Sequence, residues 1–316
     1  MSMSEVYVTL FDSFFLPQGL ALYHSLLRHG GNFRLWVLCV DQECFNFLNS
    51  LKLRNLFLLN LSDLETNDLL RIKKDRTRSE YCWTLTPWSI QWALEADLSA
   101  SRVTYVDADT YFLQSPNPIF HEFERSEKAF LITEHSYSPK YDMTPVSGRF
   151  CVQFVPVVRG AGQPLLDYWR DKCMEWCYDR FEDGKFGDQK YIEDISLLFE
   201  SKVLSLASDG RFLAPWNVDR FPLNQAILYH FHGLRILTTR SVILAGGYSL
   251  PIPVRQYIYS AYVEDLVRIR RLYSPFGFKM KRQLPLSFSI VVRILISFFF
   301  SFFDYLRRAS IDVIFF

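Results

Sequence analysis

The feature that most limits the fold is the alternation of short apolar runs with helical patterns over the first hundred residues. Runs rich in β-forming residues lie at 5–11, 34–40, 55–61 and 102–106. After the first run, leucines and a tyrosine recur at helical spacing from Leu20 to Leu27. Strands that alternate with helices form βαβ units, in which the strands are parallel. The sequence therefore predicts an α/β fold with a mixed, mainly parallel central sheet.

Capping residues and later apolar runs extend this prediction along the chain. We expect Asp41 to cap the helix after the second run, and a helix with Pro87 in its first turn to reach about Leu98. Further strands are predicted at 129–133, 150–158, 202–206 and 227–231, and helices at 164–178 and 188–200. The composition first shifts near residue 250, which predicts one domain over 1–250 and a helical tail over 251–316.

Composition narrows the class of protein. Of the 316 residues, 49% are apolar and 22% are charged, as in a packed globule and unlike a disordered chain. The formal net charge of +1 argues against nucleic acid as a partner. The six cysteines lack the spacing of a metal finger, and the first nine residues lack the basic and apolar pattern of a signal peptide. We therefore expect a cytoplasmic protein with reduced thiols.

The charge is unevenly distributed. Residues 268–316 hold nine basic and two acidic side chains (+7), whereas residues 1–267 hold 26 basic and 32 acidic ones (−6). Residues 284–303 are long enough to cross a hydrocarbon core of about 30 Å, but Arg293 in their middle would cost about 2.5–3.5 kcal/mol there. We expect this hydrophobic and basic tail to lie as a helix on an anionic membrane surface. A packed helix and a spanning helix are the alternatives.

The strongest local signal is Asp107-Ala108-Asp109, which directly follows the buried run at 102–106. Two carboxylates held so close together repel each other unless a cation neutralises them. Ligand sites of open α/β sheets lie at the carboxyl ends of the strands, and hard oxygen ligands favour Mg²⁺ or Mn²⁺. The motif therefore indicates a metal site, the alternative being a turn with two solvated aspartates.

Six short blocks in a fixed order resemble bacterial glycosyltransferases of the GT-A fold, similar to family 8. The blocks are 9–12 with 16–19 (TLFD and LPQG), 81–87 (YCWTLTP), 107–112 (DADTYF), 185–190 (KFGDQK), 213–217 (LAPWN) and 229–233 (YHFHG). The resemblance covers roughly residues 5–240. It implies a single nucleotide-sugar-binding domain of the GT-A type. It also implies a metal-dependent transfer of sugar from a nucleotide-diphosphate donor to a cell-envelope glycan or lipid-linked saccharide.

The resemblance also implies roles for individual residues. The base and ribose would face Thr9, Phe11 and Asp12. Mn²⁺ or Mg²⁺ would bind Asp107 and Asp109, of which Asp107 also belongs to the donor site, with His230 or His232 as a third ligand. Asp188 and Gln189 would act on the donor sugar as catalytic residues.

Each of these residues also has a plainer interpretation. A Thr or Phe at a strand end, as at Thr9 and Phe11, more often packs in the core, and either histidine taken alone more often makes a buried hydrogen bond. Asp188 is equally suited to capping a helix that begins at Gln189.

Two other functions compete with this one. Asp107-Ala108-Asp109-Thr110 also fits the nucleophile loop of haloacid-dehalogenase-like phosphatases, with Asp107 as nucleophile and Asp109 as acid/base. Gly187-Asp188 followed by Glu193-Asp194 would then supply the later acidic magnesium motif. A nucleotide-sugar-binding scaffold without activity is the second alternative, because Cys151 and Gln153 depart from the pattern of the family. The first stands where relatives carry an amide, and the second replaces a residue that allows close approach.

Overall fold

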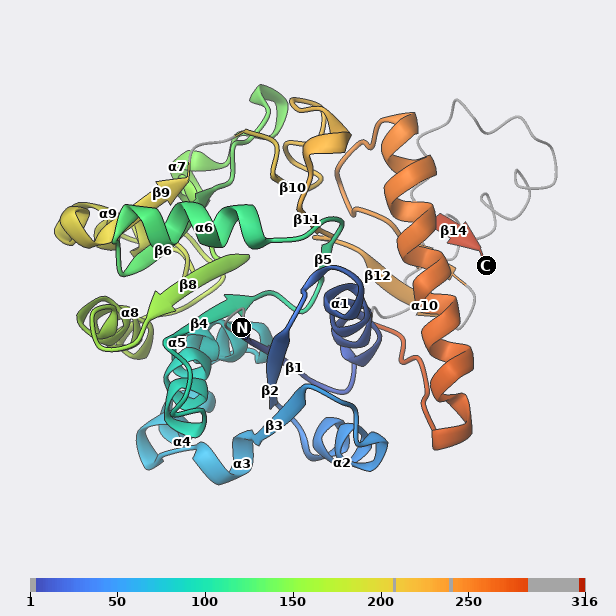
Figure 1. Ribbon diagram of the computed structural model, residues 1–316, viewed down its shortest axis with the longest axis horizontal. Coiled ribbons are helices and arrows are strands. Elements are labelled where there is room, and N and C mark those ends of the chain that lie inside the picture. The colour runs from blue at the N-terminus through green and yellow to red at the C-terminus, as the bar shows by residue number, and fades with distance from the viewer. Residues whose placement is uncertain (1–3, 207–208, 239–240, 284–312, 316) are drawn as a thin grey trace.

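The computed structural model describes residues 4–206, 209–238, 241–283 and 313–315. Within them a central sheet has the strand order β3-β2-β1-β4-β8-β6-β7, with β9 beside β6 (Figure 1). In chain order the strands are β1 Glu5–Phe11, β2 Phe33–Cys39, β3 Leu56–Asn60, β4 Arg102–Val106, β6 Phe130–Glu134, β7 Phe150–Cys151, β8 Phe154–Val158 and β9 Val203–Leu206.

The direction of the strands changes at β4. Strands β1, β2, β3 and β4 are mutually parallel, whereas β8 runs antiparallel to β4 and to β6. The parallel half follows from the helical connections of the first hundred residues, because parallel neighbours need a long crossover. The predicted α/β fold with a mixed, mainly parallel sheet is confirmed.

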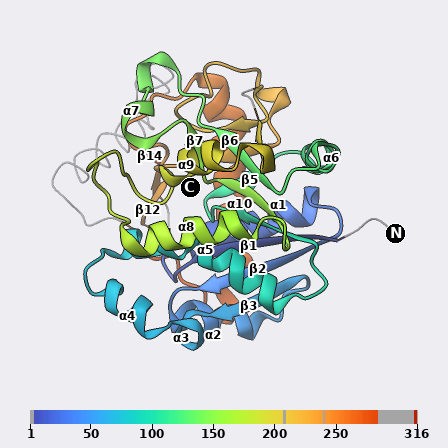
Figure 2. The same ribbon diagram turned by 90° about the vertical axis from the view of Figure 1, so that its left-hand side faces the viewer.

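Helices cover both faces of the sheet (Figures 1 and 2). One face packs against α5 (Arg78–Ala96), α8 (Gln163–Glu175) and α9 (Tyr191–Leu198), and the other against α1 (Leu16–His29), α2 (Gln42–Leu51) and α6 (Asn117–Ser126). The side chains of β1 alternate between the two faces. Val6, Val8 and Leu10 belong to the hydrophobic core on the side of α5, α8 and α9, and Tyr7 and Phe11 belong to the core on the side of α1, α2 and α6. This alternation is the two-residue period of a strand that is buried on both faces.

Two smaller sheets flank the central one. Strands β10 (Phe212–Leu213), β11 (Leu228–His230) and β5 (Thr110–Phe112) form the first, at the carboxyl end of β4. Strands β12 (Arg235–Thr238), β13 (Ser241–Ile243) and β14 (Val313–Phe315) form the second. Short helices complete the connections: α3 (Leu61–Leu64), α4 (Asn67–Lys73) and α7 (Thr144–Ser147).

The predicted start of α5 is wrong. The helix begins at Arg78, where Thr77 and Glu80 form a reciprocal capping box, and Pro87 lies in its interior. The sequence favours the first turn for this proline because its missing N–H costs nothing there. Here the strong cap and burial on the sheet stabilise the helix despite the lost hydrogen bond.

Two other predicted elements also differ from the structure. The run at 150–158 forms two strands, β7 and β8, separated by a turn at Val152 and Gln153. The helix predicted from Asp188 begins only at Tyr191 and has Lys190 as its N-cap, with no capping side chain. Asp188 is therefore not the N-cap of α9.

The C-terminal part of the described chain packs back on the body. After a π-helical turn at Val254–Tyr259, α10 (Ser260–Tyr273) lies against α1. Gln283 then ties three segments together: its side chain accepts from Ile236 N (2.9 Å) and Gln18 Nε2 (3.0 Å) and donates to Phe14 O (2.8 Å). The segment that ends at Gln283 is thus joined to the loop that follows β1.

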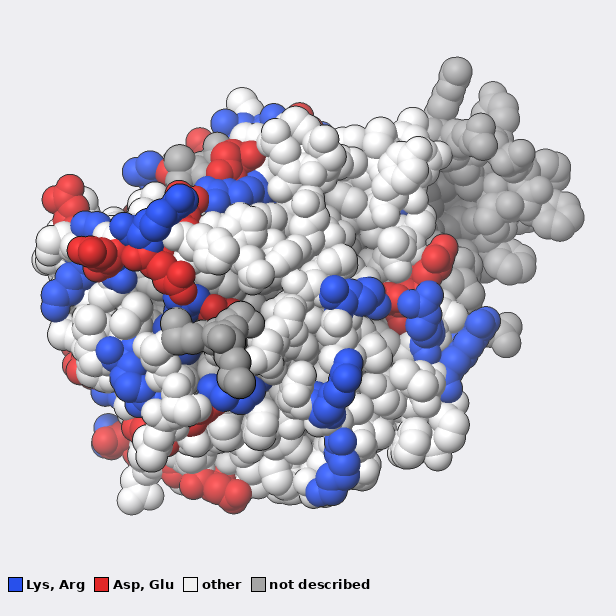
Figure 3. All heavy atoms as spheres, viewed as in Figure 1, with Lys and Arg blue, Asp and Glu red and all other residues white. Residues whose placement is uncertain are grey.

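The helix predicted over residues 284–303 lies outside the described residues. In the part of the chain that is described, no helix is both long and apolar enough to cross a membrane. Figure 3 shows Lys and Arg side chains gathered on the side of the molecule occupied by α10, α1 and α2. Two of the C-terminal cations are paired there, Arg268 with Asp265 and Lys281 with Glu43.

Candidate functional site

A tight turn between β4 and β5 presents both aspartates of the Asp107-Ala108-Asp109 motif. Thr110 closes this turn, since its backbone N–H and its hydroxyl both donate to Asp107 O, at 3.1 and 2.7 Å. β5 then pairs antiparallel with β11, in a register that sets His230 opposite Thr110. The sheet register therefore delivers a histidine from a distant part of the chain to the two aspartates.

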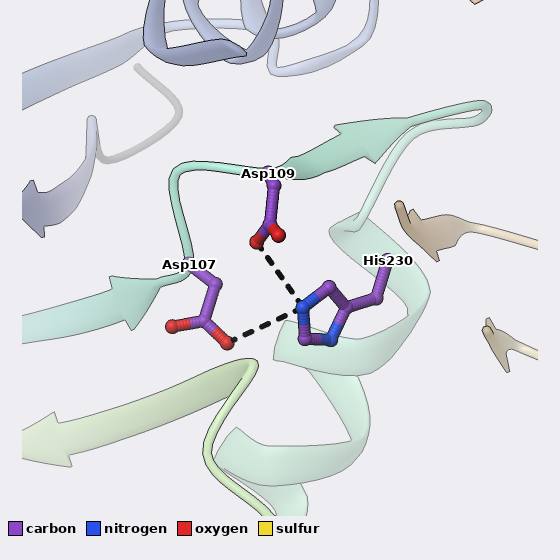
Figure 4. A group of neighbouring side chains, drawn as sticks. All are labelled: Asp107, Asp109 and His230. Atoms are coloured by element: carbon purple, nitrogen blue, oxygen red, sulfur yellow. Dashed lines mark ion pairs between the residues drawn. The ribbon is translucent and has the colours of Figure 1, made fainter. Parts of the chain in front are cut away.

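The three side chains point toward one another (Figure 4). His230 Nε2 lies 3.1 Å from Asp109 Oδ1 and 3.8 Å from Asp107 Oδ2. One ligand atom from each residue lies within 4.8 Å of those of the other two. Two carboxylate oxygens and one imidazole nitrogen around a common point are a donor set that suits Mn²⁺ or Mg²⁺. The residues present therefore fit a divalent cation.

Charge coupling within this cluster sets the protonation of its members. Burial alone would lower the pKa of His230, but the charge of Asp109 outweighs it and holds that pKa well above its usual range. Burial opposes the ionisation of Asp109, yet the ion pair with His230 holds the pKa of Asp109 low. Burial raises the pKa of Asp107, to which the charge of Asp109 contributes as well. Without a metal, a proton on His230 thus neutralises part of the charge of the aspartate pair.

The second histidine of the His-x-His pattern does not join this group. The ring of His232 lies 5.6 Å from that of His230, and the residue is exposed. β11 ends at His230, and the His232 ring packs against the rings of Trp216 (5.4 Å between centroids) and Tyr248 (6.0 Å). The geometry favours His230 as the third metal ligand. A ligand role for either histidine stays a prediction.

Asp188 is buried, at 5% exposure, and lies near enough to Asp107 for the two charges to interact. Burial and the charge of Asp107 raise the pKa of Asp188 to about 7. Tyr105, which donates to Asp107 Oδ1 at 2.9 Å, also feels the charge of Asp188. Trp169 Nε1 fixes the loop by donating to Asp188 O at 2.9 Å, and the neighbouring Gln189 is half-buried. The structure thus brings Asp188 and Gln189 to the same end of the sheet as Asp107.

The three residues predicted at the end of β1 have different environments. Thr9 and Phe11 are buried, and the Phe11 ring fills the space beside Gly19 so closely that a Cβ there would lie 2.3 Å from it. Contact of either residue with a base would require side-chain movement. Asp12 accepts from the backbone N–H groups of Phe14 (2.8 Å) and Phe15 (3.0 Å) and pairs with Arg78 at 2.5 Å. Their role in nucleotide binding stays a prediction.

The two residues that depart from the family pattern border the cluster. Gln153 lies in the turn that separates β7 from β8, and its carbonyl oxygen accepts from Asp107 N at 3.3 Å. Its side-chain Oε1 is buried without a hydrogen-bond partner among the described residues. The buried thiol of Cys151 lies beside His230 and contributes to its raised pKa. Both substitutions therefore adjoin the candidate metal ligands themselves.

Arg235 is a member of this region that sequence reasoning missed. Its charge contributes to the low pKa of Asp109, and its guanidinium lies 5.6 Å from the centre of the Phe15 ring. The signal that could have found it is its place just past Gly233, which has a positive φ of 78° and turns the chain at the end of β11. A cation here adjoins both the aspartates and the loop after β1.

Sequence comparison places the chain among bacterial relatives. Two proteins of Bacillus subtilis (strain 168) are each 30% identical to it: YfnF over 259 residues, 76% of this chain and 85% of that protein, and YfnD over 285 residues, 83% and 84%. The chain belongs to the family of YfnF and YfnD. Both are described as uncharacterized proteins, and no family model matches the chain.

Solved structures show the fold of this member of the YfnF and YfnD family. It is similar to the bifunctional glycosyltransferase WbbM (TM-score 0.54, 12% identity) and to the apo glycosyltransferase GlyE of Streptococcus pneumoniae TIGR4 (0.52, 13%). The matches cover 89% and 90% of this chain but only 52% and 66% of those two. The chain therefore has the GT-A fold, and the fold that the resemblance of the six blocks implies is confirmed.

The fold overturns the phosphatase interpretation of the aspartates. That loop ends the first strand of its domain, whereas β4 follows three strands and adjoins the antiparallel β8. The proposed later acidic motif also contacts other groups: Glu193 accepts from Arg149 N (2.6 Å), and Asp194 from Tyr168 OH (3.2 Å). The sequence allowed the phosphatase alternative because a D-x-D-x-T string is compatible with more than one kind of turn at the end of a strand.

Proposed function

We propose that the chain is a metal-dependent glycosyltransferase that moves a hexosyl group from a nucleotide-diphosphate sugar to an acceptor. The observation that carries this proposal is the convergence of Asp107, Asp109 and His230 at the carboxyl end of β4 in a GT-A fold. Open α/β sheets bind ligands at this end of their strands. A site of two carboxylates and one imidazole suits a divalent cation that bridges to phosphates.

The metal would be held by Asp107, Asp109 and His230. A bound Mn²⁺ or Mg²⁺ supplies neutralisation of the negative charge that develops on the diphosphate as the bond to the sugar breaks. Arg235, beside Asp109, would bind a phosphate oxygen from the other side. The nucleoside would lie toward the ends of β1 and β2, near Asp12 and the neighbouring residues Thr9 and Phe11.

The donor sugar would face Asp188 and Gln189. The raised pKa of Asp188, about 7, means that this carboxyl group is half-protonated near neutral pH before ligands bind. In that state it can donate a hydrogen bond to a sugar oxygen or accept one from a sugar hydroxyl. We assign Asp188 to holding the reacting sugar, with Gln189 beside it, and leave open whether the anomeric configuration is kept.

The acceptor would be a cell-envelope glycan or lipid-linked saccharide in polysaccharide synthesis, reached from the cytoplasmic face of the inner membrane. What supports this is the basic and apolar sequence of residues 268–316, which suits an anionic surface. Flotation of the full chain with vesicles containing phosphatidylglycerol tests the association. A chain that stays in the soluble fraction at low salt would contradict it. The near-zero net charge gives no reason to expect nucleic acid as a partner.

Titration calorimetry with nucleoside diphosphates, with Mn²⁺ and with EDTA, tests the function most directly. A panel of nucleotide sugars assayed for donor hydrolysis then identifies the donor. We expect Mn²⁺-dependent binding and slow hydrolysis in the wild type. Binding without turnover of any donor, with or without acceptors, would favour the scaffold alternative. Failure to bind any nucleoside diphosphate would contradict the proposal.

A further inference from the structure

Four aromatic side chains from three distant segments form a continuous cluster, here called the aromatic wall: Tyr137, Tyr141, Trp216 and Tyr248. Ring centroids are 4.8 Å apart for Tyr141 and Tyr248, 6.0 Å for Tyr137 and Trp216, and 6.3 Å for Trp216 and Tyr248. Trp216 is buried, whereas the three tyrosines are half-buried and so keep part of their surface accessible. The function proposed above gives none of these residues a role.

The wall begins at the candidate metal site. The Trp216 ring packs edge-on against His230 (5.3 Å between centroids) and against His232 (5.4 Å). His232 also contacts Tyr248 at 6.0 Å. A molecule lying on the tyrosines would therefore approach the site from the side of β11, past the exposed His232. The proposed nucleoside position is at the ends of β1 and β2 in the central sheet, whereas β11 belongs to the separate sheet β10-β11-β5.

The wall is held rigidly by hydrogen bonds between its segments. Trp216 Nε1 and Asn217 Nδ2 both donate to His135 O at 2.8 Å, and Ser138 N donates to Trp216 O at 2.8 Å. The Tyr141 hydroxyl accepts from Ser249 N at 2.7 Å. A rigid surface loses little conformational entropy when a ligand binds.

Backbone strain in the same loop points to a site. Ser136 has a φ of +54°, a conformation that non-glycine residues rarely adopt. Arg220 holds this turn by donating to the carbonyl oxygens of Ser136 (2.7 Å) and Tyr137 (2.8 Å). Strain of this kind persists where surrounding contacts impose it, and it gathers at ligand sites.

The chemistry of the wall selects a class of ligand. Tyrosine and tryptophan combine an apolar ring face with a polar group at the ring edge. Polar side chains stand at the rim, among them His232, Lys140 over the Tyr141 ring (4.7 Å), and the exposed Asp142 and Ser249. A pyranose ring matches this pattern, because its C–H face is apolar and its hydroxyl groups point outward from the edge.

We infer that the aromatic wall binds a pyranose ring of the acceptor, so that the acceptor is a glycan recognised through its sugar. This inference rests on the proposed function, because it places the ring next to the reacting group. A lipid alone would not need the polar groups at the rim of the wall. A nucleotide is not the expected ligand either, because the nucleoside is already assigned to the ends of β1 and β2. The wall thus gives the saccharide acceptor proposed above a binding surface of its own, next to the candidate metal ligands.

The test compares Tyr248→Ala with Tyr248→Phe, which keeps the ring. Saturation-transfer NMR is recorded with methyl glycosides of glucose, galactose and N-acetylglucosamine, in the presence of Mg²⁺ and nucleoside diphosphate. We expect transfer to at least one glycoside in the wild type and in Tyr248→Phe. In Tyr248→Ala the affinity should fall roughly 3- to 10-fold, the range expected for one lost aromatic contact.

Calorimetry of Mg²⁺ and nucleoside diphosphate on the same three proteins separates this inference from the proposed function. Unchanged nucleotide affinity together with weakened glycoside binding in Tyr248→Ala supports the wall. Nucleotide binding without glycoside binding in the wild type, or equal glycoside affinity in all three proteins, overturns the wall and leaves the proposed function standing. Glycoside binding without nucleotide binding in the wild type supports the wall and contradicts the proposed function.

Discussion

Two pairs of aspartates stand at the carboxyl ends of neighbouring strands in this sheet: Asp12 and Asp41 follow β1 and β2, and Asp107 and Asp109 follow β4. In the first pair the carboxylates bind backbone N–H groups of the chain that follows: Asp12 accepts from Phe14 N and Phe15 N, and Asp41, the N-cap of α2, accepts from Cys44 N. Arg78 joins the pair, at 2.5 Å from Asp12 and 2.7 Å from Asp41. Each of these four oxygens therefore has a hydrogen-bond or ion-pair partner.

The second pair has a different kind of partner. Asp107 accepts from the Tyr105 hydroxyl, and among the described residues both aspartates form their ion pairs with His230. An arginine keeps its charge at any accessible pH, whereas a histidine can release its proton and then bind a metal. Position in the sheet alone does not separate a structural carboxylate from a ligand. The difference between a structural carboxylate and a metal ligand here is whether its positively charged partner can lose that charge, as His230 can and Arg78 cannot.

Removing one carboxylate of the second pair should give the largest effect. We expect Asp109→Asn to weaken Mn²⁺ binding and to reduce donor turnover by at least about 100-fold, because loss of even an outer-shell partner costs about 10- to 100-fold at metal sites. Calorimetry with Mn²⁺ and a turnover assay measure this, and circular dichroism checks the fold. Unchanged Mn²⁺ affinity in this variant would remove the metal site.

Asp188 is a third carboxylate that extends this comparison between structural and ligand-binding aspartates. Its charge interacts with that of Asp107, and it is not the N-cap of a helix. We expect Asp188→Asn to lower kcat by about 10- to 100-fold while nucleotide affinity changes little, because its partner is the reacting sugar. Steady-state kinetics with the identified donor separate the two quantities. An equal loss in nucleotide affinity would show instead that Asp188 supports the metal site as a whole.

The removable proton on His230 predicts a pH dependence. Because the ion pair with Asp109 raises the pKa of His230, metal binding must displace a proton below that pKa. Mn²⁺ affinity should therefore increase about tenfold per pH unit until the pH exceeds the pKa. In His230→Gln this slope should be absent, and a slope that persists there would assign the proton to another group.

The metal-free protein should show the opposite trend in stability. A raised folded-state pKa means that the charged His230 stabilises the fold below the pKa of the unfolded chain. That contribution is lost as the pH rises through the folded-state pKa. Thermal unfolding with EDTA across this range measures it, with His230→Gln as the control that should lack the trend.

The first aspartate pair should respond in stability and not in Mn²⁺ affinity. We expect Asp12→Ala to destabilise the fold by about 1–3 kcal/mol, because the hydrogen bonds from Phe14 N and Phe15 N and the ion pair with Arg78 are lost, while Mn²⁺ affinity stays at the wild-type value. Asp12→Asn is the matched control, since its amide oxygen can still accept from Phe14 N and Phe15 N. Denaturant unfolding and calorimetry give the two quantities. A loss of Mn²⁺ affinity in Asp12→Ala would contradict the conclusion that only the second aspartate pair takes part in metal binding.

Much of the first half of the fold could be predicted because its signals are local. The strand at 5–11 and the strand at 102–106 match β1 and β4, and Asp41 caps α2 as expected. β-branched runs buried on both faces and side chains that bond nearby backbone groups leave clear marks in the sequence. The break between β7 and β8 leaves none, since it depends on a turn beside Asp107 that only the assembled sheet requires.

The site shows the same division. The aspartate motif could be predicted from adjacent residues, but the choice between His230 and His232 depends on where β11 ends. The aromatic wall and Arg235 were not found, because tyrosines and arginines are common in any chain and their meeting depends on long-range packing. The packing of the Phe11 ring against Gly19 in the core was equally hidden, because it joins a strand to the helix that follows it.

The hydrogen bonds of Gln283 decide where this chain can be shortened. A version ending at Tyr273 would discard Gln283 together with Lys281, whose ammonium donates to Ser13 Oγ at 2.9 Å, and so would release the loop after β1. A stop codon placed after Gln283 keeps these contacts and removes the apolar stretch, at the cost of leaving the edge of β13 without β14. For crystallisation or binding assays, the useful boundary therefore lies after residue 283.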